Sequence, residues 1–270
     1  MKGIQKVIKY IAIALAMFII INICGGILFG LSMIAAIFGL DEGEDIPESE
    51  RITQLEDIKQ IKKLDIEIKF AKLSIKHGDM FKVEANDKNI YCNKSGDSIQ
   101  IRDKNNSLRS KNKEVIIYIP DDFVFEDVNI IAGAGKVDVE FLLAKNLSFD
   151  IGAGSAVVKE LTVLEKAKIN GGAGNFEIRS GSMNNLELNV GAGKTEVESE
   201  ILGNSKIEAG IGKLDLHLIG DDYRIETENG IGVVKINGDT VTRESKYGDG
   251  NNLLKVEGGI GSIDINFKNR

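Results

Sequence analysis

Residues 130–139 read IIAGAGKVDV, and the pattern of this stretch recurs through the second half of the chain. At its centre is a Gly-x-Gly signature in which x is Ala or Ile. Successive copies begin 19, 20, 19, 19, 20 and 29 residues apart, so the stretch is one unit of a repeat. The copies occupy residues 133–135, 152–154, 172–174, 191–193, 210–212, 230–232 and 259–261.

Apolar residues alternate on both sides of each signature. In the first copy the apolar positions are Ile130, Ala132, Val137 and Val139. This period of two predicts strands with one buried face. The alternation changes phase once, at the second Gly of every copy, and such a slip would otherwise turn the core face outward. The chain is therefore predicted to bend there, because Gly permits unusual backbone angles and a close approach of neighbouring backbones.

One repeat cannot fold alone. It offers about five inward apolar side chains, which contribute on the order of 10 kcal/mol when buried, whereas ordering roughly twenty residues costs about 1–2 kcal/mol each. Stacking supplies the missing stabilisation, since the strand edges of one repeat can pair with the next about 4.8 Å away. The chain is predicted to be an all-β, single-stranded, right-handed parallel β-solenoid of 19–20 residues per rung, its hand following that of parallel crossovers.

The repeats begin before the first Gly-x-Gly copy. Residues 64–75 show the same change of phase, with Ala71 and Lys72 where later copies have Gly, and they are predicted to form the first rung. Residues 238–252 are a polar, Gly-rich insertion that accounts for the one interval of 29 residues. Further strands are expected at residues 81–85, 90–92, 99–102 and 115–119.

The N-terminus is predicted to be a membrane anchor. Residues 1–9 carry three lysines and no acid, residues 10–40 carry no charge, and acidic residues follow. About 20 apolar residues span a bilayer as a helix, and the order of charges predicts a cytoplasmic N-terminus and an extracytoplasmic C-terminal domain on the cell membrane. A cleaved signal peptide would have a shorter apolar region. A lipoprotein signal at Cys24 is disfavoured because the preceding Ile23 is bulky.

Three segments follow from these patterns. Residues 1–40 are the cytoplasmic basic tip and transmembrane anchor, residues 41–63 an acidic tether, and residues 64–270 the β-solenoid ectodomain. The tether can be interpreted as a short helix or as a strand.

Composition excludes several classes of function. The net charge is −7 and no long basic tract follows the N-terminus, so nucleic acid is not an expected partner. Cys24 and Cys92 are too few for a disulfide framework. His77 and His217 are too far apart in sequence to form a zinc site with a single remote Cys.

The chain resembles a known family. Residues 64–75, the VIIYIP stretch at 115–120 and the serial GAG copies resemble the bacterial putative-adhesin family of membrane-anchored β-strand-repeat envelope proteins. The resemblance covers residues 60–268 and is specific for architecture. It implies a domain of unknown function, associated with surface adhesion or cell-envelope stress systems, with no catalytic residue to carry over.

Two stretches that look like ligand motifs are rejected. GAGKT at residues 191–195 lacks the first Gly of a phosphate loop, since Leu188 stands in its place. GGAGN at residues 171–175 lacks the Asp of the calcium-binding nonapeptide, since Phe176 stands there. No cofactor is therefore expected.

The outward position four residues after the middle of each signature is mostly acidic. In stacked rungs these carboxylates would align as a column, a candidate linear site for divalent cations or a cationic envelope ligand. The favoured alternative is a solvated face whose acids are offset by lysines at the adjacent outward position, as at Lys136, Lys194 and Lys213. The acidic residues are Asp138, Glu177, Glu196, Asp215 and Asp264.

The insertion is the other candidate site. Arg243, Lys246, Tyr247 and Asp249 within it could form a contact loop on a rigid scaffold, or the insertion could be merely tolerated. A polysaccharide-acting enzyme is disfavoured, because the acids follow the repeat and aromatic platforms for sugar rings are scarce. The expected function is a non-enzymatic, adhesin-like surface scaffold that contacts an envelope polymer or a membrane protein. The alternative is an accessory role in envelope-stress sensing.

Overall fold

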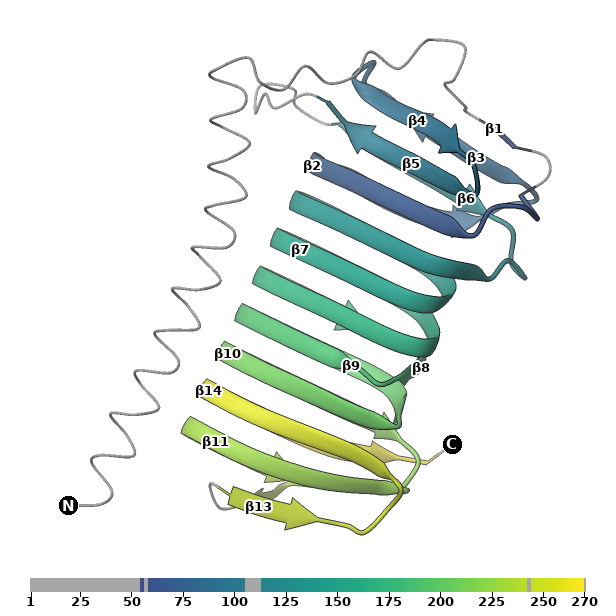
Figure 1. The fold of residues 1–270 in the computed structure, drawn as a ribbon. Coiled ribbons are helices and arrows are strands. Elements are labelled where there is room, and N and C mark those ends of the chain that lie inside the picture. Colours follow the sequence, from purple (N-terminus) through teal and green to yellow (C-terminus); the bar gives the residue numbers. More distant parts are fainter. Residues whose placement is uncertain (1–53, 56–57, 105–112, 242–243, 270) are drawn as a thin grey trace.

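The computed structural model describes residues 54–55, 58–104, 113–241 and 244–269. These residues form one 14-stranded sheet that coils into a column of stacked rungs (Figure 1). The strands are β1 (Gln54–Leu55), β2 (Lys63–His77), β3 (Phe81–Ala85), β4 (Ile90–Ser95), β5 (Ser98–Asp103), β6 (Glu114–Ile119), β7 (Phe125–Ile178), β8 (Gly181–Asn184), β9 (Glu187–Leu202), β10 (Asn204–Ile219), β11 (Tyr223–Ile236), β12 (Asp239–Val241), β13 (Glu244–Tyr247) and β14 (Asn252–Lys268).

The rungs stack in parallel and in the predicted register. Ile207 of β10 pairs with Leu188 of β9, which in turn pairs with Ile169 of β7. The inward position four residues before the middle of the signature carries Ile130, Phe149, Leu188 and Ile207, each no more than 1% exposed. The predicted all-β solenoid with its internal apolar columns is therefore confirmed, while its right-handed winding stays a prediction.

Each rung bends at the second Gly of its signature. All seven of these glycines have φ between 124° and 156°, a conformation that residues with a side chain rarely adopt. A Cβ added at any of them would lie 1.8–2.4 Å from a backbone oxygen of the neighbouring rung. Gly is therefore required twice over, for the backbone angle and for the close approach of the rungs.

The degenerate bend of β2 is explained by its neighbour. On one side β2 pairs with β5 over residues 63–67 and with β6 over residues 72–77, and no pairing is described there for residues 68–71. Ala71 thus has no described backbone partner on this side and does not have a positive φ, so a residue with a side chain fits at the position that is Gly in later copies.

The order of the rungs differs from the predicted serial order at both ends of the column. β2, predicted to be the first rung, lies second, because β5 and β6 together form the terminal rung beneath it. At the other end β14, the last strand in sequence, lies between β10 and β11 (Figure 1). The prediction that each rung stacks on the one before it is wrong at these two places, because rungs of one register can accept each other in any order.

Antiparallel strands cover both terminal rungs. β4 pairs with β5 and β3 with β6 at one end, while β12 and β13 pair with β11 at the other. An open parallel edge would be a template for association with other chains. The insertion at residues 238–252 thus provides most of the cap at the C-terminal end of the column.

The N-terminal predictions fall largely outside the described residues, which exclude residues 1–53. Within the described ranges no helix is long and apolar enough to cross a membrane. The end of the predicted tether belongs to the folded domain, since Ile58 and Ile61 are buried in the core and Gln54–Leu55 form a strand. At Gln54–Leu55 the structure has the strand alternative of the tether, whereas residues 58–62 form neither a strand nor a helix.

Candidate interaction surfaces

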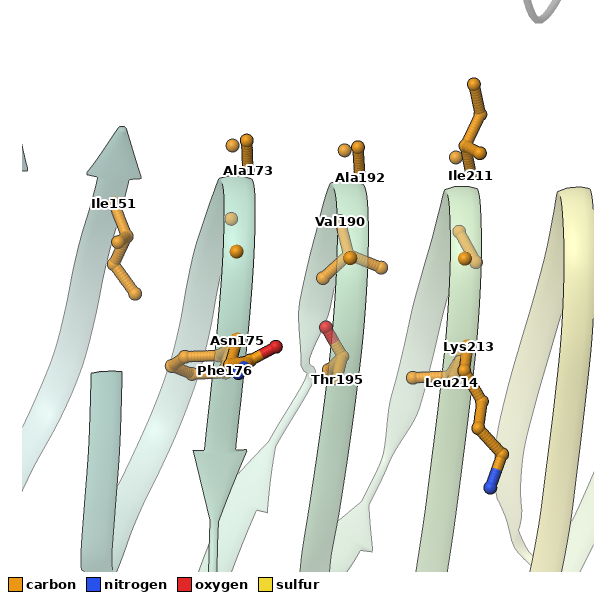
Figure 2. A pocket seen from close by; sticks show the side chains of 18 of the residues that line it. Ile151, Ala173, Asn175, Phe176, Val190, Ala192, Thr195, Ile211, Lys213 and Leu214 are labelled. Carbon is orange, nitrogen blue, oxygen red and sulfur yellow. The ribbon is translucent and has the colours of Figure 1, made fainter. Parts of the chain in front are cut away.

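The outer tips of the bends form a continuous apolar edge along the column. In-register pairing stacks Ala173 on Ala192, Ala192 on Ile211, Ile211 on Ile260 and Ile260 on Ile231. Figure 2 shows Ala173, Ala192 and Ile211 at the tips of three successive bends, pointing away from the interior. We call this edge the bend ridge; it comprises Ala134, Ala153, Ala173, Ala192, Ile211, Ile260 and Ile231.

The ridge changes from flat to bulky toward its C-terminal end. Ile211, Ile260 and Ile231 are 49%, 41% and 40% exposed, and the neighbouring Val233 is 44% exposed. Each of these branched residues thus keeps two fifths to one half of its surface exposed. Together they form an exposed apolar stripe. The sequence pattern did not indicate this stripe, because the middle residue of each Gly-x-Gly signature defined only the position of the repeat.

A small hollow lies beneath the ridge, inside the bend. It has a volume of about 30 Å³ and is lined by residues of four consecutive rungs. In two of these rungs a small lining residue lies near a larger one in the sequence: Gly171 near Phe176, and Ala209 near Leu214. A hollow of this size has room for about one water and is far smaller than the roughly 300 Å³ of a small-molecule site.

The predicted acidic column exists, but its carboxylates are paired. Glu177, Glu196, Asp215 and Asp264 align in register across four rungs. Each has a cationic neighbour on the same face, as does Asp138. The pairs are Asp138–Lys136 at 3.0 Å, Glu177–Arg179 at 2.7 Å, Glu196–Lys194 at 2.7 Å, Asp215–Lys213 at 2.8 Å and Asp264–Lys213 at 3.9 Å.

These ion pairs favour the solvated-face interpretation of the column. The hydrogen bond from Lys194 lowers the pKa of Glu196, and the same bond raises the pKa of Lys194. Each partner thus stabilises the charged form of the other, so the carboxylates are offset before any external cation arrives. In the ranges that the structure describes, no three His, Cys, Asp or Glu side chains gather as metal ligands would.

The proposed contact loop is part of the C-terminal cap. Lys246 on β13 forms an ion pair with Glu226 of β11 at 3.1 Å, and Tyr247 stacks on Phe267 with 5.5 Å between ring centroids. Asp249 is exposed in the turn that follows, and Arg243 lies outside the described residues. These partners attach the segment to the column; its role in contacting other molecules stays a prediction.

Cys92 on β4 is a structural residue whose reactivity can be predicted. Burial raises the pKa of the Cys92 thiol to about 12. The thiolate is the reactive species, and an unperturbed Cys has a pKa of about 8.5. In a Cys24→Ser chain, where Cys92 is the one remaining thiol, we therefore expect Cys92 of the folded protein to react with a disulfide reagent about three orders of magnitude more slowly than Cys92 of the protein unfolded in urea. The measurement is the absorbance of the released thiolate; equal rates in both conditions would contradict it. The folded state holds this proton more tightly, so the associated stability is lost as the pH rises above about 8.5.

A buried ion pair near the N-terminal end was not foreseen from the sequence. Lys113 Nζ lies 3.1 Å from both carboxylate oxygens of Asp103 and 3.7 Å from Asp87 Oδ2. The side chains of Lys113 and Asp103 are 1% and 0% exposed. They join the end of β5 to the start of β6, where the terminal rung has no Gly-x-Gly bend.

The Toastrack DUF4097 family model matches residues 60–257, and no curated protein matches the chain. A solved structure titled as a putative cell adhesion protein from Clostridium sporogenes is 19% identical, with a TM-score of 0.34, covering 81% of this chain and 98% of that one. Another, titled as a putative adhesin from Bacteroides fragilis, is 14% identical, with a TM-score of 0.36, covering 82% and 98%.

Proposed function

The chain belongs to the Toastrack DUF4097 family, which confirms the family that its repeats resemble, and on this premise we propose that it is a membrane-anchored, non-enzymatic surface scaffold. Its β-solenoid makes adhesin-like contacts outside the cell membrane. The bend ridge is the observation that carries the proposal, because contiguous exposed apolar side chains on a folded domain mark sites of interaction.

Two further observations support a scaffold over an enzyme. The charged face beside the ridge is a ladder of ion pairs, so its carboxylates do not converge on a common point. The hollow beneath the ridge holds about 30 Å³, too little for a substrate. A rigid column with long, regular faces suits repeated contacts with an extended partner, such as an envelope polymer or a membrane protein.

The ridge can be tested by removing its bulky apolar side chains. We expect the triple replacement Ile211→Ser, Ile231→Ser and Ile260→Ser to weaken attachment of cells that display the protein roughly tenfold or more, since a few buried anchors dominate interface energy. Attachment to isolated cell-envelope material is the measurement. Leu164→Ser is the matched control, because Leu164 is 47% exposed outside the ridge. Unchanged attachment by a triple variant that keeps its β-sheet circular dichroism would contradict the proposal.

A second candidate function is an accessory role in sensing cell-envelope stress. The predicted anchor at residues 1–40 favours it, because it would hold the solenoid beside membrane partners. The same triple variant separates the two: a changed stress-reporter output with unchanged attachment favours signalling. Deleting the insertion at residues 238–252 would be a poor test, because the deletion also removes β12 and β13 from the edge of β11.

A further inference from the structure

The last strand of the chain is inserted between two strands that already share its register. Ile260 of β14 pairs with Ile211 of β10 on one side and with Ile231 of β11 on the other. β10 and β11 are therefore in phase with each other through β14. If β14 left the column, β11 could pair directly with β10 in the register that the repeat defines.

The side chains and backbones of β10 and β11 fit such direct pairing. Two outward positions would bring opposite charges together, Lys206 with Glu226 and Asp215 with Lys235, as the shared partners on β14 define. At a third position Glu208 would lie opposite Glu228, as it now lies beside Glu257. At present Asp215 lies beside Asp264. Both strands also carry Gly on each side of the ridge isoleucine, as close backbone approach requires.

The linker between the two strands also permits it. Only Gly220, Asp221 and Asp222 lie between the end of β10 and the start of β11. In the present order this linker spans two layers, about 9.6 Å, within the reach of extended residues at about 3.3 Å each. Direct stacking needs a span of one layer, which the single Gly203 provides between β9 and β10.

A polar clasp fastens the start of β14 in the gap. Asn251 donates its backbone N–H to Asp222 Oδ1 at 2.8 Å, and the Asn252 side chain donates to the backbone oxygen of Asp222 at 3.0 Å. Asn252 Oδ1 also accepts from the backbone N–H of Gly203 at 2.9 Å. The clasp thus ties the first residues of β14 to the turns on both sides of it.

We propose that β14 is an insertable rung and that the chain has a second folded arrangement in which β11 stacks directly on β10. β12 and β13 pair with β11, so the cap moves with it and the shorter column stays closed. The released strand, residues 252–268, has the pattern of a rung and fits the same gap in a second copy of the chain. Exchange of this strand between two copies would join the two solenoids without a new interface, because the strand makes the same contacts in the partner copy as in its own chain. This inference does not depend on what the bend ridge binds.

Engineered disulfides distinguish the two arrangements in the full chain, with Cys24→Ser as background. A disulfide requires Cα atoms within about 7 Å, so paired rungs allow one and rungs two layers apart do not. The pair Ile211→Cys and Ile260→Cys should therefore oxidise readily, whereas Ile211→Cys with Ile231→Cys should stay reduced. All three positions are on the exposed ridge, so access to the oxidant does not differ between the pairs.

Gly261→Val is the change that should expel β14. A Cβ at Gly261 would lie 1.8 Å from the backbone oxygen of Gly212. We expect the disulfide between positions 211 and 231 to change from undetected to the main intramolecular product, with β-sheet circular dichroism retained. A chain that stops after Gly250 should give the same product. The proposal is overturned if neither altered chain forms this disulfide in its folded state, whether β11 stays away from β10 or the domain unfolds.

Discussion

Replacing Gly174 with alanine is expected to destabilise the solenoid by roughly 3–5 kcal/mol, a large part of the 5–15 kcal/mol that stabilises a typical domain. Gly174 has φ of 132°. Its added Cβ would lie 1.9 Å from the backbone oxygen of Gly154 in the next rung. Neither problem can be relieved by a side-chain movement, because the obstacle is the backbone that pairs the two rungs. The midpoint of urea unfolding, followed by circular dichroism, measures the loss.

Gly171 provides the matched control three residues earlier in the same rung. Its added Cβ would meet Val190 Cγ1 at 3.4 Å and the backbone oxygen of Asn189 at 3.9 Å, both ordinary contacts, and it would face the hollow beneath the ridge. We expect Gly171→Ala to leave stability unchanged or to raise it by up to about 1 kcal/mol, since alanine restricts the unfolded chain. Equal losses in the two variants would show that the bend does not require Gly for the reason given.

The second large effect is expected from Asp103→Ala. This change leaves the ammonium of Lys113 buried without its nearest carboxylate, in a side chain that is 1% exposed. Removing one partner of a buried pair costs about 3–5 kcal/mol, because the remaining charge has lost its solvation and its counterion. The midpoint of urea unfolding again measures the loss of stability. Hydrogen exchange should show it first at the N-terminal end of the column, as faster exchange of the protected backbone amides of β5 and β6.

Two comparisons show whether the buried charge is the cause. The double replacement Asp103→Leu with Lys113→Met removes both charges, and we expect it to recover most of the lost stability. Glu140→Ala breaks the exposed Glu140–Lys159 pair, 3.4 Å apart, and should cost no more than about 1 kcal/mol. An Asp103→Ala variant as stable as Glu140→Ala would contradict the assigned role of the pair.

The bends and columns were predictable because they depend on local pattern. Alternation places Ile130 and Val137 inward whichever rung lies next to them, and the phase change at Gly135 marks the bend without reference to a partner. The acidic column followed from the same spacing, and the structure aligns Glu196 with Asp215 as expected. The same spacing indicated the lysine neighbours of Asp138, Glu196 and Asp215, and the structure pairs them. It did not indicate the pairing of Glu177 with Arg179, which lies on the other side of the acid in sequence.

The terminal features were not predictable in the same way. Lys113 and Asp103 flank a polar segment, where charged residues are ordinarily solvated, and only the closure of the terminal rung buries them. Lys246 and Tyr247 gave no strand pattern that pointed to β11, because their short antiparallel pairing depends on an edge that exists only after the column has formed.

The amino-acid sequence by itself determined the unit of this protein: a strand, a Gly-dependent bend and a second strand, with one face that must be buried by stacking. The tertiary structure alone decided the order of the units and the covering of the two ends. The physical reason is that backbone pairing between rungs of equal register scarcely distinguishes one copy from another. The choice of neighbour therefore falls to linkers, caps and clasps, such as the contacts of Asp222 with Asn251 and Asn252.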